Sequence, residues 1–250
     1  MNKLAELTLR VMDPVAQSRF YCDVLSMKDL GSGRIGYSSQ EVALRFLPAG
    51  APYVPAKSDL YWKIAISVPN IELAYAQLQS RGVRVSGPKQ FRDVGYLALF
   101  DDPEGFSVEL IDHAFQGERS GKPHDESLLG GGAHLSLVTL RTADIETVEA
   151  ELLRWGMRPL SVQPVTPYCF TLYFYAFTDE MRPNPDLEAI ENRVWVYQRP
   201  YTVLELQHVH GLDAETNRIG GAAGYDGLTI ITSGTDLASD QLKISSVADG

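Results

Sequence analysis

Two arginines, Arg10 and Arg141, occupy the same place in a sequence pattern that occurs twice. Residues 8–13 read TLRVMD and residues 139–144 read TLRTAD, so each arginine stands three residues before an aspartate. A planar guanidinium is suited to a carboxylate, which can belong to a ligand or to an acid on a neighbouring strand. The pattern leaves both roles open.

The repeated pattern extends to four places in the chain. A third start lies at residues 63–70 (KIAISVPN) and a weaker fourth at residues 228–232 (LTIIT). The first three read as a strand that leads into a capped helix, with Asp13 followed by a proline as one helix start. Such repetition predicts four copies of a small strand–helix–strands module, of which the fourth is short.

The modules predict a two-domain organisation. Residues 116–132 are polar and end in three glycines, which is typical of a linker. We therefore expect a first domain over residues 1–115, built by modules one and two. A second domain is expected over residues 133–250, built by modules three and four. A proline-bounded insertion, residues 178–200, interrupts the third module.

Composition excludes several classes of partner. The net charge of −10 argues against nucleic acid, because phosphate contacts need clustered lysine and arginine. No apolar run approaches the roughly 18–20 residues that span a bilayer, and the N-terminus lacks the apolar core of a signal peptide. We expect a cytoplasmic protein with a small-molecule ligand, no nucleic-acid or membrane partner, and the option of a homodimer.

Five segments resemble one known family. They are residues 9–14 (LRVMDP), 20–27 (FYCDVLSM), 102–110 (DPEGFSVEL), 170–174 (FTLYF) and 202–206 (TVLEL). Together they resemble the vicinal oxygen chelate superfamily of glyoxalase I, extradiol dioxygenases and bleomycin-resistance proteins, and the last two are most like glyoxalase I. The resemblance implies an α+β fold in which tandem βαβββ modules pair into two half-open barrels, or cups, with the fourth module degenerate or truncated.

In this family each cup holds one metal on up to four inward side chains. In the first domain these positions fall on Glu6, Arg45, Lys63 and Glu109. Two acids and two bases predict a charge-neutral salt-bridge network in place of a metal, since buried charges persist when they are paired. The alternative is that Arg45 or Lys63 holds an anionic substrate, or that Lys63 acts as a base.

In the second domain the same positions fall on Leu137, Glu205 and Gly227, and the last lies near the chain end. Glu205 is therefore the candidate catalytic base. A β-bulge that turned His134 inward would pair this histidine with Glu205. His208 or His210 could then add a further ligand.

The resemblance thus implies two sets of site residues. Substrate-binding candidates are Arg10 and Arg141, which match an arginine that grips a glutathione carboxylate in glyoxalase I, together with Arg45 and Lys63. The candidates for holding one divalent metal (Fe, Mn, Ni or Zn) are Glu205, His134, Glu109 and Glu6.

Three functions remain open from the sequence. The first is a lactoylglutathione lyase-like or dioxygenase-like enzyme, of lyase, isomerase or ring-cleaving type, that acts on a small oxygenated, anionic or glutathione-linked substrate. The second is a metal-free protein that binds or sequesters a small molecule, as bleomycin-resistance proteins do. The third is a structural scaffold. Metal content would separate the first function from the second, and a ligand-sized cavity would separate the second from the third.

Overall fold

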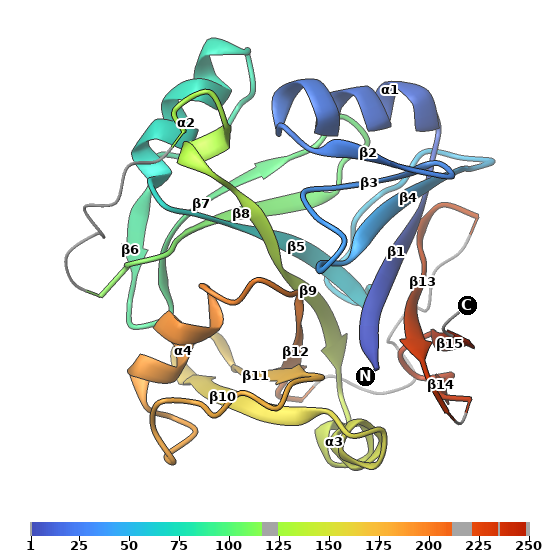
Figure 1. The fold of residues 1–250 in the computed structure, drawn as a ribbon, viewed down its shortest axis with the longest axis vertical. Coiled ribbons are helices and arrows are strands. Elements are labelled where there is room, and N and C mark those ends of the chain that lie inside the picture. The colour runs from blue at the N-terminus through green and yellow to red at the C-terminus, as the bar shows by residue number, and fades with distance from the viewer. Residues whose placement is uncertain (1, 117–124, 212–221, 235, 249–250) are drawn as a thin grey trace.

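The computed structural model describes residues 2–116, 125–211, 222–234 and 236–248, which form two mixed β-sheets and four α-helices (Figure 1). The helices are α1 (Pro14–Arg19), α2 (Ile71–Ser80), α3 (Ile145–Arg154) and α4 (Ile190–Val196). A π-helical turn, Phe20–Val24, continues α1. None of these helices is long and apolar enough to cross a bilayer.

The first three helices begin at acidic or amide side chains that accept hydrogen bonds from the first helical turn. Asp13 accepts from two backbone N–H groups of α1, and Asn70 and Asp144 each accept from one in α2 and α3. Such caps satisfy N–H groups that have no partner within the helix. The repeated aspartate of the two sequence patterns is therefore a helix cap in both copies.

One sheet is built by the two ends of the chain, and we call it the terminal sheet. Its strand order is β14-β15-β13-β1-β4-β3-β2. The strands are β1 (Lys3–Val11), β2 (Lys28–Gly31), β3 (Arg34–Gly36), β4 (Ala43–Pro48), β13 (Gly224–Thr232), β14 (Ala238–Ser239) and β15 (Ile244–Ala248). It combines the first and fourth modules, and the fourth is short, with no helix among its described residues.

The other sheet, the central sheet, has the order β10-β11-β12-β9-β5-β8-β7-β6. Its strands are β5 (Tyr61–Val68), β6 (Lys89–Phe91), β7 (Gly95–Asp101), β8 (Ser107–Asp112), β9 (His134–Thr142), β10 (Arg158–Val165), β11 (Phe170–Ala176) and β12 (Val203–Val209). It combines the second and third modules and curls into a half-barrel.

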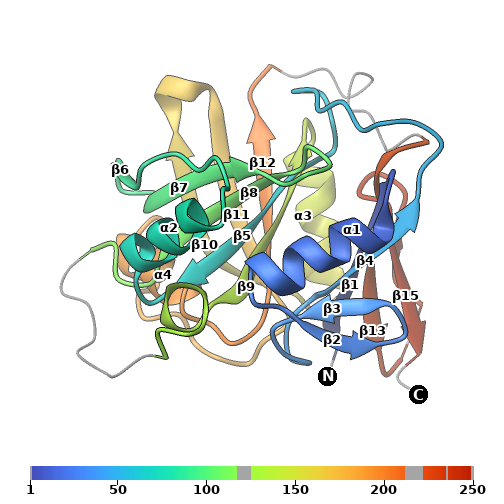
Figure 2. The same ribbon diagram turned by 90° about the horizontal axis from the view of Figure 1, so that it is seen from above.

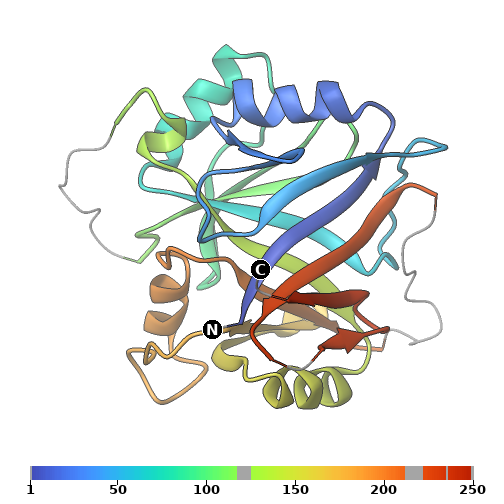
Figure 3. The ribbon, with the colours of Figure 1, turned by 45° about the vertical axis from the view of Figure 1, so that its right-hand side comes forward.

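This pairing corrects the expected pairing of modules within residues 1–115 and within 133–250. Strand β1 pairs antiparallel with β13, and β5 pairs antiparallel with β9 (Figure 3). In each of the first three modules the last strand pairs in parallel with one edge of the first strand. The other edge of the first strand is then free to pair with a strand from another module. Module pattern alone does not decide which strand takes that edge.

The segment expected as a linker is partly packed. Residues 117–124 lie outside the described part of the chain, but Leu129–Gly131 form a buried 3₁₀ turn against α2. Gly130 accepts a hydrogen bond from the N–H of Asn70 and donates one to Gln77. A Cβ atom at Gly130 would lie 2.7 Å from Cβ of Val68, so this glycine permits a close approach.

Both sheets turn one face toward a shared apolar core. Leu7 and Leu9 of β1 and Ile64 and Ile66 of β5 are buried in it with side chains of α2 and α3. The two sheets lie on opposite sides of the molecule in Figure 2. Because side chains alternate along a strand, the residues between these apolar positions face away from the shared core. We call these two outward faces the terminal cup and the central cup.

Candidate functional site

The terminal cup carries Glu6 and Thr8 of β1 and Arg45 of β4. The Thr8 hydroxyl donates to Oε1 of Glu6 at 3.3 Å, and Nη1 of Arg45 lies 3.7 Å from the same oxygen. The Arg45 side chain is 44% exposed, and Glu6 is its one charged partner among the described residues. Its guanidinium therefore retains donors directed to solvent.

The fourth module supplies a second charged group to this cup. Asp226 of β13 accepts from Nζ of Lys243 at 2.9 Å and pairs with Nη2 of Arg10 at 2.9 Å. Burial alone would raise the pKa of the Asp226 carboxyl, but the hydrogen bonds from Lys243 and Arg10 outweigh it and hold that pKa below its usual value. The Asp226 carboxylate is therefore stabilised in its charged form and positions the side chains of Lys243 and Arg10.

Between these groups lies a cavity of about 600 Å³. Its described lining comes from β1, β4 and the fourth module: Glu6, Thr8, Arg45, Leu47, Asp226, Gly227, Thr229, Ala238, Ser239, Asp240, Lys243, Ile244 and Ser245. The lining contains hydroxyls and charges of both signs and no aromatic ring. Such a surface suits a small hydrophilic molecule rather than a planar aromatic one.

The central cup contains a buried ion cluster on four strands. Nζ of Lys63 lies 2.9 Å from Oε2 of Glu109, 3.2 Å from Oε1 of Glu205 and 3.2 Å from Oγ1 of Thr139. The Thr139 hydroxyl donates to Oε1 of Glu205 at 2.9 Å. The side chains of Lys63 and Glu205 are each 3% exposed. We call these four residues the Lys63 cluster.

The two carboxylates keep Lys63 charged. Burial alone would lower the pKa of the Lys63 ammonium, but Glu109 and Glu205 outweigh this effect and raise it. For Glu109 the balance is opposite, because burial raises the pKa of its carboxyl more than Lys63 lowers it. The ammonium of Lys63 is thus the charge that the surrounding acids stabilise most clearly.

The predicted network of Glu6, Arg45, Lys63 and Glu109 is therefore divided. Glu6 pairs with Arg45 in the terminal cup, whereas Lys63 and Glu109 lie in the central cup with Glu205. The reason is the module pairing, which separates the first module from the second.

The inward position on the first strand of the third module was expected at Leu137. The residue of β9 that joins the Lys63 cluster is instead Thr139, two residues further along the strand. Strand pairing sets Thr139 opposite both Lys63 and Glu205. The sequence held a signal for this position, because Thr139 and Thr8 occupy the same place in the repeated pattern. Asp226 and Lys243 were also missed, since the fourth module carries too weak a pattern to fix its register.

Apolar side chains cover the concave face of the central cup. Leu137, Phe174, Val196 and Tyr197 are buried there in a second core cluster. Val196 belongs to α4, so the insertion that interrupts the third module packs over this face. Glu205, the expected catalytic base, is therefore enclosed by protein and directed to Lys63.

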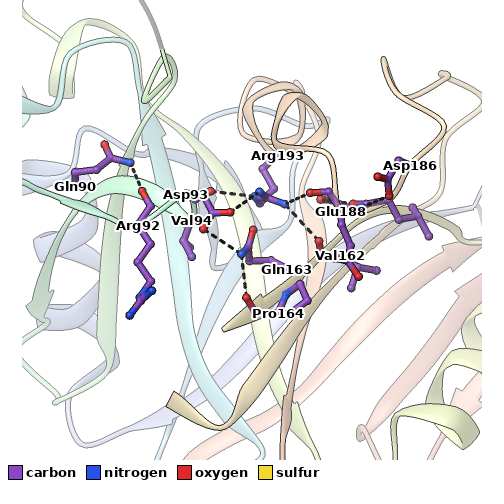
Figure 4. Close-up of polar contacts among 12 residues, drawn as sticks. Gln90, Arg92, Asp93, Val94, Val162, Gln163, Pro164, Asp186, Glu188 and Arg193 are labelled. Carbon is purple, nitrogen blue, oxygen red and sulfur yellow. Dashed lines mark hydrogen bonds and ion pairs between the residues drawn. The ribbon is translucent and has the colours of Figure 1, made fainter. Parts of the chain in front are cut away.

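Arg193 of α4 fastens this cover to both sides of the half-barrel (Figure 4). Its guanidinium donates to the carbonyl oxygens of Asp93, Val162 and Glu188 at 3.1–3.3 Å, and Nη2 lies 3.3 Å from Oδ2 of Asp93. Gln163 of β10 also donates to Asp93 at 3.2 Å. The two edges of the central sheet thus meet through Asp93, which follows β6.

The histidines do not join Glu205. His134 lies five residues before Thr139, roughly 16 Å along an extended strand, and its Nδ1 is 3.3 Å from Nε2 of His113. Burial is the main cause that lowers the pKa of His113 to about 4 and that of His134 to about 3, so both rings are neutral.

His208 and His210 lie at the end of β12 and after it, with ring centroids 5.3 Å apart. Nε2 of His210 is 3.0 Å from Oγ1 of Thr171. Neither histidine contacts Glu205 in the described structure.

Arg141 has a structural role in the described chain. It donates to Oε1 of Gln207 at 2.9 Å and to the carbonyl of Asp59 at 3.2 Å, and it lies over the ring of Trp62. Arg10 and Arg141 therefore both contact groups of the protein itself, and Arg10 does so through an ion pair with Asp226, which lines the terminal cavity.

The residues present do not fit the metal that the resemblance implies. Of the four expected ligands, only Glu109 and Glu205 lie in one cluster, and the Lys63 ammonium stands between them. No group of three or more histidine, cysteine or acidic side chains with metal-binding geometry occurs in the described ranges. In the terminal cup the acids alternate with arginine and lysine, which repel a cation.

Comparison with known proteins agrees with this architecture. Residues 3–110 match the family model described as "Glyoxalase/Bleomycin resistance protein/Dioxygenase superfamily". No curated protein sequence matches the chain.

Two solved structures share the fold over most of the chain. Glyoxalase I from Zea mays has a TM-score of 0.62 and 18% identity, over 94% of this chain and 75% of that chain. A putative dioxygenase from Bacillus subtilis subsp. subtilis str. 168 has a TM-score of 0.53 and 15% identity, over 92% and 70%. At this level of identity the likeness shows the two-cup fold and not the reaction.

Proposed function

Residues 3–110 match the model of the glyoxalase/bleomycin resistance protein/dioxygenase superfamily, and from this premise we propose that the terminal cup binds a small anionic molecule without a metal. One observation carries the proposal. The half-exposed guanidinium of Arg45 faces a cavity of about 600 Å³, and among the described residues its one ion pair is a 3.7 Å contact with Glu6.

Charge and shape of the cavity define the ligand class. Arg45 offers a planar fork that matches a carboxylate or a phosphate, and Lys243 adds a second cation to the lining. Glu6 and Asp226 balance these charges, so a ligand that also carries hydroxyl or amino groups would find acceptors. The volume lies within the roughly 300–1,000 Å³ of small-molecule sites.

The enzymatic activities implied by the resemblance receive less support. A lyase, isomerase or ring-cleaving dioxygenase of this superfamily relies on a metal, and the described donor sets do not fit one. Glu205 also lacks the access that a general base needs, because it must come within hydrogen-bond reach of the substrate proton. Binding without turnover is therefore the function that the geometry favours.

Calorimetric titration with a panel of small acids tests this proposal. The panel contains short dicarboxylates, hydroxy acids, phosphate esters and an S-substituted glutathione, each with its uncharged amide or alcohol analogue. We expect at least one acid to bind while its neutral analogue does not. Arg45→Gln should weaken that binding at least tenfold, because a charge-assisted hydrogen bond contributes on the order of 1.5–3 kcal/mol.

Arg19→Gln is the matched control, since Arg19 is exposed on α1 outside the cavity lining. It should bind the same acid as the unmodified protein does. If no acid binds, or if the Arg45 variant binds as tightly as the control, the proposal is wrong.

A further inference from the structure

The Lys63 ammonium has the coordination of a bound cation. It donates toward three oxygens at 2.9–3.2 Å, supplied by β8, β9 and β12, while Lys63 itself comes from β5. An ammonium has three N–H donors, and here each has an acceptor. The ring of Trp62 has its centroid 4.9 Å from Nζ and adds a further favourable contact for a cation.

We infer that Lys63 is the resident cation of the central cup, and that Glu109, Thr139 and Glu205 form an oxygen site that accepts a free divalent cation when the amino group is removed. The inference does not depend on the proposed ligand site in the terminal cup. It accounts for the two buried acids of the central cup, whose donors do not fit a metal while Lys63 lies between them.

The distances distinguish an ammonium from a metal. Oxygen–metal bonds are about 2.0–2.6 Å for magnesium and calcium, whereas the three oxygens lie at hydrogen-bond distance from Nζ. With Lys63 in place, a metal would meet a like charge at the centre of the cluster. The lysine therefore excludes a soluble cation by occupying its position.

Removal of the side chain would leave two carboxylates and one hydroxyl around an empty volume. Two carboxylates buried without a cation are strongly unfavourable. Carboxylate and hydroxyl oxygens suit Mg²⁺, Ca²⁺ and Mn²⁺, and water can complete the coordination. Because the cup is covered by α4, the cation would enter most readily while the chain folds.

The test is refolding from urea in the presence and absence of Mn²⁺, with bound manganese counted after gel filtration. Lys63→Ala should refold poorly without Mn²⁺, refold well with it and retain about one ion per chain. The unmodified protein should refold equally under both conditions and retain none. Lys63→Met, which fills the volume without a charge, should gain nothing from Mn²⁺.

A second variant identifies the ligands. Lys63→Ala combined with Glu205→Gln should lose the response to Mn²⁺, because one anionic ligand is gone. The inference is overturned if Lys63→Ala refolds to the same extent with and without Mn²⁺, including failure under both conditions. It is also overturned if the Met variant binds manganese as the Ala variant does.

Discussion

Lys63 and Glu205 are 142 positions apart in the chain, yet their charged atoms lie 3.2 Å apart in the central cup. Lys63 belongs to the second module and Glu205 to the third. Their ion pair spans the antiparallel junction of β5 and β9, so it exists only because modules two and three share one sheet. This buried ion pair therefore reports on module pairing.

Loss of the Lys63 charge should destabilise the fold strongly. In Lys63→Met, Glu109 and Glu205 would be buried without a cation, and removal of one partner from a buried ion pair costs about 3–5 kcal/mol. Urea unfolding at neutral pH measures this loss. The deficit should shrink as the pH falls and the carboxylates take up protons, and Lys63→Met combined with Glu205→Gln should recover part of it. A loss below about 1 kcal/mol would contradict a buried charged cluster.

The His113–His134 pair should make the protein less stable in mild acid. Both pKa values are below the ordinary 6.5, at about 4 and about 3, so the unfolded chain binds protons that the folded rings do not. The contribution of the two neutral rings to the unfolding free energy is fully present above pH 6.5. It is lost progressively as the pH falls from 6.5 toward the folded-state pKa values of about 4 and about 3. In urea titrations across this range, His134→Gln should flatten the dependence on pH. His210→Gln, at an exposed position, should keep the original slope; equal slopes for the two variants would contradict the prediction.

Arg193 should be the strongest single attachment of α4. Arg193→Met would leave the carbonyls of Asp93, Val162 and Glu188 without this donor, and each unsatisfied buried group costs about 1–3 kcal/mol. We expect a loss of several kcal/mol in unfolding free energy and faster proteolysis within residues 178–200. Arg199→Met is the control, since Arg199 pairs with the half-exposed Glu180 and such pairs contribute about 0–1 kcal/mol. Similar losses for both variants would mean that Arg193 does not fasten the cover.

Gly130 should resist substitution although it lies in a glycine run. Gly130→Ala would place a methyl group 2.7 Å from Cβ of Val68, at a residue whose φ is +55°, and overpacking of this kind costs about 1–3 kcal/mol. Gly87→Ala, where no atom lies within 4 Å of the new Cβ, should have little effect on the melting temperature. If both variants have the melting temperature of the parent protein, Gly130 does not make the close packing contact that this prediction assumes.

The local parts of this fold were readable from the sequence. The pattern around Asp13 predicted a helix cap, which the structure confirms, and the structure places a cap at the repeated Asp144 as well. Residues 3–110 match the model of the family that the sequence resembles, and the α+β fold is confirmed. Caps and alternating strands depend on residues a few positions apart, so a short segment contains all the information they need.

Only the tertiary structure decided how the charged residues combine. Glu6, Arg45, Lys63 and Glu109 were all recognised as charges at inward positions, but two lie in one cup and two in the other. The choice between β1–β13 and β1–β5 pairing depends on contacts over the whole chain, such as the buried core between the sheets. The same long-range packing lets α4 cover the central cup and leaves the terminal cup as an open cavity. The sequence by itself thus determined which modules and inward charges this protein has, whereas non-local packing determined which charges became core and which line a site.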